Sequence, residues 1–337
     1  MGKYVLKRIG YILIVFLILS VMFFFIFNAI PGDPAARDVQ ELLGKVSEEV
    51  YQERYMMARQ RLGLDDPMII RYFRWLGNVL RLDFGYSSFF QLQCKDVIFG
   101  NKALGVDSRL GNTVLMNVFQ LILVLGITIP LGIYCAIKRN SAFDRGVQVF
   151  TIVGYSTPSF VLCLLAIFIF SVQLGWFPVS GWTTPGVVHA NEWEKFRDIM
   201  YHLAVPLFVM TISGLGGMTR YVRAAMIDSL NSDYVRTARA KGLRERVVIY
   251  SHAWRNALLP VITLIMGWFI GIFGGSLVIE QTFVLQGMGR IYIQSLNNQD
   301  YNMAQTVQLF YVAISLVGNL IIDLSYGLVD PRVRITK

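Results

Sequence analysis

Six long apolar runs, almost free of charge, dominate this sequence and limit what it can fold into. A helix that crosses a bilayer needs about 20 mostly apolar residues, because the hydrocarbon core is about 30 Å thick. In lipid, only a helix or a closed barrel satisfies its own backbone hydrogen bonds. We therefore predict an all-α polytopic integral membrane protein with about six transmembrane helices. The predicted spans are residues 9–30, 114–137, 147–172, 201–219, 258–279 and 304–328.

The composition agrees with lipid as the main solvent and argues against two other classes of protein. Of the 337 residues, 55% are hydrophobic and 16% are charged, and the mean hydropathy is +0.51. The net charge of +9 could suggest a nucleic-acid binder, but long apolar runs separate the basic residues. Cys94, Cys135 and Cys163 include no CxxC pair, so neither a disulfide framework nor a zinc site is expected.

The basic residues predict the orientation of the spans. If the N-terminus is cytoplasmic, the inner segments hold 17 Lys or Arg against 5 acidic residues, and most other basic residues fall in one long outer loop. Short cytoplasmic loops are enriched in Lys and Arg, whereas long loops do not follow this rule. Both termini are therefore expected to be cytoplasmic. Lys3, Lys7 and Arg8 could begin a signal peptide, but no small-x-small cleavage site follows the first run, so we expect it to be retained.

The predicted spans divide the chain into four parts. These are a cytoplasmic N-terminus with the first span at 1–30, an extracytoplasmic helical loop at 31–113, a five-helix transmembrane core at 114–328 with a cytoplasmic loop at 220–257, and a cytoplasmic tail at 329–337. In the fifth span Gly267, Gly271 and Gly275 recur every four residues and share one helix face. We expect another helix, from this chain or from a second subunit, to approach closely there.

The loop at 31–113 carries signals for two helices. Ser47 can cap a helix that ends at Gly63, and Asp66 followed by Pro67 can open a second helix. Apolar residues of the second helix recur at helical spacing, at Ile69, Phe73, Leu76 and Leu80. We therefore predict a folded outer cap, which is either a docking surface or a packing lid without a partner.

The loop at 220–257 is too elaborate for a simple connector, since it holds eight of the 17 inner basic residues. Ser232 or Asp233 can cap a short helix, and Gly242 can end it in a left-handed conformation. A second helix from about 245 to 257 would hold the first against the membrane. It would place on one side Val247, Tyr250, Ser251 and Trp254.

Seven short motifs lie in order along nearly the whole chain. They are IPGDP at 30–34, LGLDDP at 62–67, DFGYS at 83–87, GYSTPSF at 154–160, DYVRTARAKGL at 233–243, RNALLP at 255–260 and DPR at 330–332. With this order and spacing the chain resembles the permease subunits of ABC importers, specifically those of the dipeptide, oligopeptide and nickel group. The order and spacing together are highly specific, although each motif alone is weak.

This resemblance implies a role for the short helix at its centre. In the family it is the coupling helix, which docks in a groove of a separate ATPase subunit and transmits the closure of that subunit to the spans. Small residues within a compact, charged helix would let it sit close in such a groove. The residues implied are Asp233, Tyr234, Arg236, Thr237, Ala238, Arg239, Ala240, Lys241 and Gly242.

The resemblance also implies partners and a location. The chain would sit in the bacterial cytoplasmic (inner) membrane and form a translocation pathway with a second, similar permease. Two cytosolic ATPases would carry ATP and Mg, so this chain would bind no cofactor and perform no chemistry, and an extracytoplasmic binding protein would deliver the solute. The solute would be a di- or oligopeptide, with nickel or another small solute as the alternative. Neither the exact solute, nor the pathway-lining residues, nor the transport direction follows from the residues alone.

An enzyme is the first rival class of function. The sequence contains neither the phosphate-binding motif GxxxxGK[ST] nor the metalloprotease motif HExxH. His189, His202 and His252 fall in separate segments, where ordinary interfacial residues are expected rather than metal ligands. Energy for transport would therefore come from a partner.

An ion-coupled carrier is the second rival, and its sign would be polar residues within spans. Asn319 and Asp323 lie on one face of the last span, and Glu280 lies at the outer end of the fifth. These three residues could line a pathway or join helices by hydrogen bonds. A single acid within a span gives little support for proton coupling.

Overall fold

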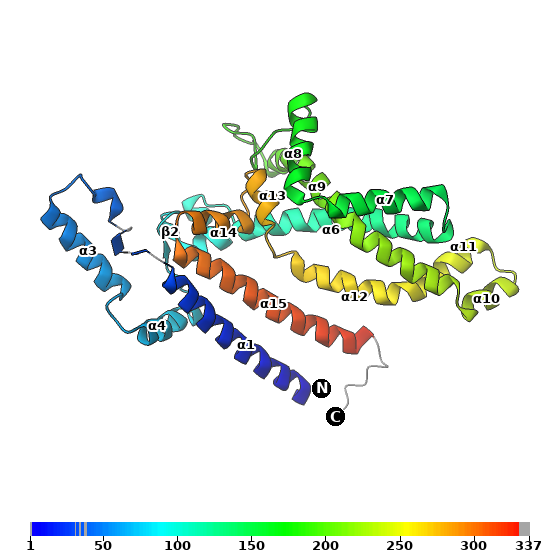
Figure 1. Ribbon diagram of the computed structural model, residues 1–337, viewed down its shortest axis with the longest axis horizontal. Helices are drawn as coiled ribbons and strands as arrows, with labels where there is room; N and C mark the ends of the chain where they lie inside the picture. Colours follow the sequence, from blue (N-terminus) through cyan, green and yellow to red (C-terminus); the bar gives the residue numbers. More distant parts are fainter. Residues whose placement is uncertain (1, 31, 34, 37–38, 330–337) are drawn as a thin grey trace. The chain divides into compact units, whose positions relative to one another are not determined.

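The computed structural model describes residues 2–30, 32–33, 35–36 and 39–329, and nearly all of their regular structure is helical (Figure 1). Within this part of the chain, five helices are long and apolar enough to cross a bilayer, and one bent pair of helices would provide a sixth crossing. The predicted all-α membrane fold is therefore confirmed. The DPR motif and most of the predicted tail lie outside the described residues. The chain divides chiefly into two compact units, Met1–Gly111 with Ile291–Leu320, and Asn112–Arg290.

The first unit combines two long helices with the folded segment that follows the first of them. Its elements are α1 (Gly2–Ala29), η1 (Gln40–Leu42), α3 (Glu48–Leu62), α4 (Met68–Leu80), β1 (Tyr86–Ser87), β2 (Leu92–Gln93), α5 (Cys94–Phe99), η2 (Lys102–Leu104), and most of α14 (Met288–Asn297) and α15 (Tyr301–Val329). The two helices predicted between 31 and 113 are confirmed: α3 follows Ser47 and ends at Gly63, whose φ is +62°, and α4 follows Pro67.

Charged residues of two sequence motifs secure α3. The hydroxyl of Tyr55, on α3, donates to Asp33 of IPGDP at 2.5 Å. Arg59, one turn further along α3, donates through Nε and Nη2 to Asp65 of LGLDDP at 3.0 and 2.7 Å. Arg74 of α4 pairs with the adjacent Asp66 at 2.6 Å. These motif residues therefore stabilise the segment between α1 and α4.

A small hairpin ties the DFGYS motif to the start of α15. Strands β1 and β2 pair antiparallel, with Ser87 opposite Leu92. The buried Ser87 hydroxyl donates to the carboxylate of Asp300, and the Phe89 N–H donates to the same carboxylate at 3.2 Å. This carboxylate thus holds the hairpin at the start of α15.

The second unit is built around α9, a helix of 39 residues (Figure 1). Its elements are α6 (Arg109–Ile137), α7 (Ala142–Ser156), α8 (Ser159–Ala166), the π-helix η3 (Ile167–Gln173), α9 (Glu192–Leu230), α10 (Asp233–Ala240), α11 (Glu245–Val247), the π-helix η4 (Val248–Trp254), α12 (Arg255–Gly271) and α13 (Leu277–Thr282). Glycines let helices approach α9 closely. A Cβ at Gly216 would lie 2.6 Å from the Thr151 carbonyl oxygen of α7, and one at Gly132 of α6 would lie 2.8 Å from Val222.

The predicted third span at 147–172 is wrong as a single straight helix. Helix α7 ends at Ser156 and α8 begins at Ser159, with a bend of 102° between the two helical segments. Proline disfavours the helical conformation in the residue before it, and Thr157, before Pro158, is extended at φ −73° and ψ 127°. The proline within GYSTPSF therefore breaks the apolar run into two helices.

The predicted fifth span at 258–279 also ends early. Helix α12 stops at Gly271, and a non-helical break separates it from α13. The side-chain amide of Asn117, on α6, donates to two carbonyls of this break, Ile272 and Gly274, at 2.8 Å each. Gly275 consequently does not continue the helical face predicted for the three glycines.

Candidate functional site

The short helix predicted within 220–257 is present as α10. One of its sides packs against other helices of the second unit. Val235 and Ala238 are buried in a cluster with residues from α6, α9 and η4, including Met226 and Val248. Gly242 follows the helix at φ +73°, the left-handed conformation predicted for its end. Ser232 is the N-cap residue, but its side chain makes no capping bond. The other residues of α10 are exposed.

A single serine joins α10 to both neighbouring helices. The Ser229 hydroxyl, in the last turn of α9, donates to the Ala253 carbonyl of η4 at 2.7 Å. It also lies 2.7 Å from the Tyr234 hydroxyl of α10, which can donate to it. The bond to the Ala253 carbonyl is buried and so is shielded from water. These hydrogen bonds therefore fix the adjoining parts of α9, α10 and η4 relative to one another.

The second predicted helix exists, and most of the residues predicted to share one of its sides lie on its exposed side. From Glu245 the chain runs through α11 and the π-helix η4 into α12. Val248, Ile249 and Ala253 are buried, whereas Val247 and Tyr250 are exposed. Ser251 is exposed as well, and Trp254, the fourth residue of the predicted side, is partly buried against the cluster beneath.

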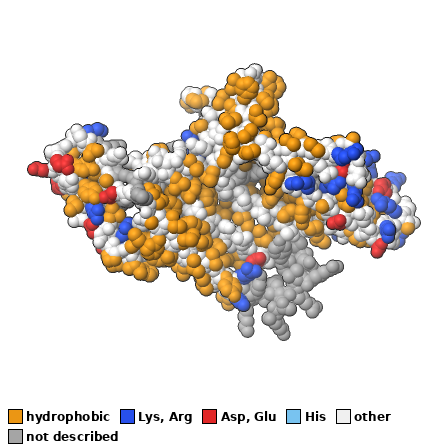
Figure 2. Space-filling view, in the orientation of Figure 1, with side chains coloured by type: hydrophobic (Ala, Val, Ile, Leu, Met, Phe, Trp, Pro, Cys, Tyr) orange, Lys and Arg blue, Asp and Glu red, His pale blue; other side chains and the backbone are white. Residues whose placement is uncertain are grey.

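The outward surface of α10 and α11 is strongly charged. Arg236, Arg239 and Arg246 are exposed there, and Figure 2 shows blue and red side chains gathered at the end of the unit where α10 and α11 lie. Arg239 pairs with Glu245 of α11 at 2.8 Å across the turn at Gly242. The small residues expected to let α10 sit close in a groove are Thr237, Ala238 and Ala240. Thr237 and Ala240 are exposed, whereas Ala238 is buried against the core.

Glu280 is fully buried in α13, beyond the end of the candidate span at Gly271. Its carboxylate accepts hydrogen bonds from the backbone N–H groups of Ser276 and Arg290, at 3.1 and 3.0 Å, and from the Thr113 hydroxyl of α6, at 3.3 Å. Burial raises the pKa of this carboxyl, against the effect of the N–H donors. A Cβ at Gly287 would lie 2.4 Å from its Oε2, so the following turn requires glycine there. Glu280 therefore has the contacts of a helix-packing residue.

The two polar residues singled out in the last span lie on α15. Asn319 is exposed and Asp323 is partly exposed. Among the described residues, no group of three or more His, Cys, Asp or Glu side chains is arranged to hold a metal ion.

Sequence reasoning missed a cluster around Asp198, near the start of α9. The Asp198 carboxylate lies 3.0 Å from Nε2 of His189 and 3.7 Å from Nε2 of His202, and the Thr184 N–H and hydroxyl donate to it at 2.8 and 2.7 Å. Two of the three histidines expected in separate segments therefore meet. The four-residue spacing of Asp198 and His202 on one helix was a signal that the sequence offered. Thr184 and His189 lie in the loop before α9, and no pattern in the sequence indicated their contact with Asp198.

A second missed feature is a buried ion pair between α7 and α9. Asp144, fully buried, accepts two hydrogen bonds from the Arg223 guanidinium at 2.7 Å each, and one from the Asn140 N–H at 2.8 Å. The two partners are 79 positions apart, so no local pattern indicated the contact. This pair locks α7 to the part of α9 that leads into α10.

The chain matches families of transport proteins over nearly all of its length. Residues 128–335 match the family described as binding-protein-dependent transport system inner membrane component, and residues 1–125 match the N-terminal family of such membrane components. The chain belongs to this family. It is therefore a multi-pass inner-membrane permease subunit of an ABC importer, and the ATPase is a separate protein.

Full-length relatives of this permease carry similar descriptions. The oligopeptide transport system permease protein AppB of Bacillus subtilis (strain 168) is 36% identical over 336 residues, 99% of this chain and 100% of that protein. A protein of Brucella suis biovar 1 named as a peptide permease is 36% identical over 338 residues, all of both chains. A Sinorhizobium fredii protein named as a peptide ABC transporter permease is 30% identical, over 99% of this chain and all of that one. A solved structure, described as inward-facing conformations of the MetNI methionine ABC transporter, has a TM-score of 0.48 and 16% identity, covering 64% of this chain and 94% of that chain.

Permeases of this family work in general with a partner permease, an ATPase and a solute-binding protein. The confirmed parts of the sequence interpretation are thus the all-α membrane fold and the permease role in an ABC importer.

Proposed function

We propose that this permease imports di- or oligopeptides across the bacterial inner membrane. The observation that carries the proposal is the match over the full length of both chains to permeases named for peptides or oligopeptides. A second, homologous permease would complete the pathway, an extracytoplasmic binding protein would deliver the solute, and two cytosolic ATPases would hold ATP and Mg. Nickel or another small solute is the alternative cargo.

We propose that α10 is the coupling helix of this permease. Its outward face is charged and its inward face is buried, so it can contact a partner without losing its own packing. The bonds of Ser229 connect it rigidly to α9 and η4, and η4 continues into α12. A push on α10 would therefore reach two candidate spans. This role requires α10 in the cytoplasm, which agrees with cytoplasmic termini and with the excess of basic residues on that side.

The open face of α12 supports pairing with a second permease. A Cβ added at Gly267 or Gly271 would meet nothing within 4 Å in the described part of the chain. Small residues on a membrane helix favour close approach of another helix. We propose that this neighbour belongs to the partner permease.

Substitution of Ala240 tests the coupling role. We expect Ala240→Glu to abolish uptake by the assembled transporter, because it adds bulk and negative charge on the outward face of α10, while the folded permease still inserts. Gly242→Asp should act similarly and also strain the left-handed turn. The control is Arg139→Glu, which also introduces a glutamate but lies in the loop between α6 and α7. This variant should retain uptake. Normal uptake by Ala240→Glu would reject the coupling assignment.

The cargo is tested with the permease assembled with its binding protein and ATPases in vesicles. We expect di- or oligopeptides to stimulate ATP hydrolysis and to accumulate in the vesicles. Stimulation by nickel alone, with no response to peptides, would favour the alternative. Hydrolysis of ATP by the isolated permease would contradict both.

A further inference from the structure

Helix α4 exposes the apolar stripe that the sequence predicts for it. Ile69, Phe73 and Leu80 are 62%, 65% and 72% exposed, whereas the buried residues of the helix are Tyr72 and Val79. An apolar face of this kind is unfavourable in water and marks contact with a partner or with a membrane. The first unit itself does not cover this stripe.

The buried side of α4 is attached to α1 at membrane depth. The Tyr72 hydroxyl lies 2.9 Å from the Ser20 hydroxyl in a buried contact, and the Tyr72 ring packs on Phe24 with centroids 5.5 Å apart. Helix α1 provides a candidate span over Val5–Ala29. At 1.5 Å per residue, Ser20 lies about 13 Å from the end of that span. Since the hydrocarbon core is about 30 Å thick, Tyr72 lies within the adjoining half of the bilayer.

The first turn of α4 meets the end of α1 where polar groups can reach water. Arg71 donates through Nη2 to Oδ1 of Asn28 at 2.6 Å, one residue before the end of α1. Trp75 lies beside Phe24 with centroids 5.4 Å apart. Aromatic and basic side chains of this kind are typical of the membrane interface. The start of α4 therefore lies beside the end of the candidate span in α1.

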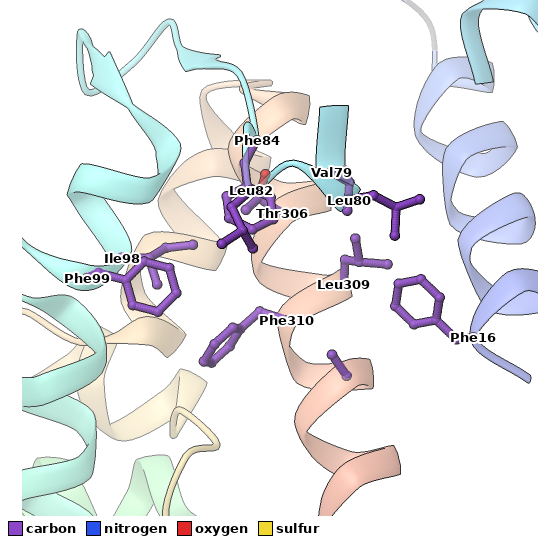
Figure 3. Close-up of a pocket in the computed structure, with 11 residues that line it drawn as sticks. Phe16, Val79, Leu80, Leu82, Phe84, Ile98, Phe99, Thr306, Leu309 and Phe310 are labelled. Atoms are coloured by element: carbon purple, nitrogen blue, oxygen red, sulfur yellow. The ribbon is translucent and has the colours of Figure 1, made fainter. Parts of the chain in front are cut away.

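A cavity of about 380 Å³ lies where α4, α5, α1 and α15 meet (Figure 3). Phe16 of α1, Leu80 of α4 and Phe310 of α15 point into it, and Thr306 is the only lining residue with a polar side chain. The Thr306 hydroxyl already donates to the Asn302 carbonyl at 2.6 Å. Apolar cavities that offer no free polar partner do not hold water. The cavity therefore suits an apolar occupant.

We propose that α4 is an interfacial helix embedded in the leaflet adjoining residues 31–113, and that a phospholipid acyl chain occupies this cavity. The occupant follows from continuity with lipid, because the cavity is walled by the candidate spans α1 and α15, and only 11% of the α1 span is buried within the molecule. Lining residues Leu80 and Phe99 are 72% and 49% exposed, so the cavity is open to its surroundings. The lipid holds α4, and hence the segment between α1 and α6, at the membrane surface. Of the two predicted helices of 31–113, only α3 is then available for docking in water.

The depth of α4 is tested by nitroxide labels in the full chain reconstituted into phosphatidylethanolamine and phosphatidylglycerol vesicles. Phe73→Cys on α4 is compared with Met56→Cys on α3, which is similarly exposed. The native cysteines are buried, and burial raises the pKa of the Cys94 thiol to about 12, so it stays protonated and unreactive at the labelling pH. We expect the label at 73 to collide with oxygen more than with a water-soluble nickel chelate, and the label at 56 to show the reverse.

Two outcomes of this measurement overturn the embedded helix. A label at 73 that collides freely with the nickel chelate would place α4 in water. A label at 73 that is immobile and shielded from both reagents would place a protein partner, such as a helix of the second permease, on this face.

The cavity is tested separately with a phosphatidylglycerol that carries a photoreactive diazirine on its acyl chain. Ala313→Phe, which fills the cavity from α15, should reduce crosslinking to peptides of α1 and α15 several-fold. Val317→Phe adds the same side chain to an exposed position one turn along α15, outside the cavity lining, and should leave crosslinking unchanged. Both variants are first checked for wild-type elution on size exclusion. Equal crosslinking in the two variants would show that no acyl chain occupies the cavity.

Discussion

Helices α10 and α4 each have one buried side and one exposed side, but the exposed side is charged in α10 and apolar in α4. Helix α10 buries Val235 and Ala238 and exposes charges, as a helix on a water-facing surface does. Helix α4 buries Tyr72 through a hydrogen bond and aromatic contacts and exposes its apolar stripe. Helix α10 ends just before the predicted Gly242, and α4 begins directly after the predicted Pro67. The difference shows that a periodic pattern predicts a two-sided helix, whereas the surrounding solvent decides which side faces outward.

The largest expected effect is on the buried side of α10. Val235→Asp should lower the free energy of unfolding by about 4 kcal/mol or more, because it places an unpaired carboxylate in the cluster with Met226 and Val248. Thermal unfolding in detergent, followed by size exclusion of a fluorescent fusion, measures the loss. Arg236→Asp on the exposed side of the same helix should change stability by less than about 0.5 kcal/mol. Equal losses in the two variants would show that α10 is not packed as described.

A smaller effect is expected at the attachment of α4 to α1. Tyr72→Ala should lower stability by about 3 kcal/mol, because it removes a buried ring beside Phe24 and the hydroxyl contact with Ser20. Limited proteolysis of reconstituted protein should also cut more readily between α3 and α5. Phe73→Ala, on the exposed side, should leave the cleavage pattern unchanged. Protection of both variants would mean that α4 does not depend on Tyr72.

The smallest effect is expected for the exposed ion pair beside α10. Arg239→Gln should change stability by no more than about 0.5 kcal/mol, because both it and Glu245 are well exposed and solvent screens the pair. A double-mutant cycle with Glu245→Gln measures the coupling energy directly. A coupling energy several times larger would indicate that the turn at Gly242 is held by this pair rather than by the buried side of α10.

Helix ends were predictable where one residue type controls the backbone. Gly63 and Gly242 adopt the left-handed conformation that few other residues tolerate, and both follow helices at the predicted places. Pro158 carried a similar local signal for the broken third span, but the apolar run around it suggested one helix. The early end of the fifth span had a weaker signal, because glycines are also frequent within membrane helices.

The candidate site was predictable in outline and not in detail. The motif DYVRTARAKGL located α10, but the inward position of Ala238 depends on the cluster beneath it. The bond of Ser229 to Ala253 and the pair of Asp144 with Arg223 join residues that are 24 and 79 positions apart. No periodicity relates such positions, so only the packed helices bring them together.

The sequence by itself determined that this chain enters a membrane, where glycine ends α3 and α10, and which family it belongs to. These properties depend on apolar length, on the backbone preferences of single residues and on the order of short motifs. Tertiary structure alone decided which side of each helix is covered, where spans break and which charges pair. The physical reason is that backbone conformation responds to near neighbours in the chain, whereas side-chain burial depends on the distant segment, or the lipid, that lies against it.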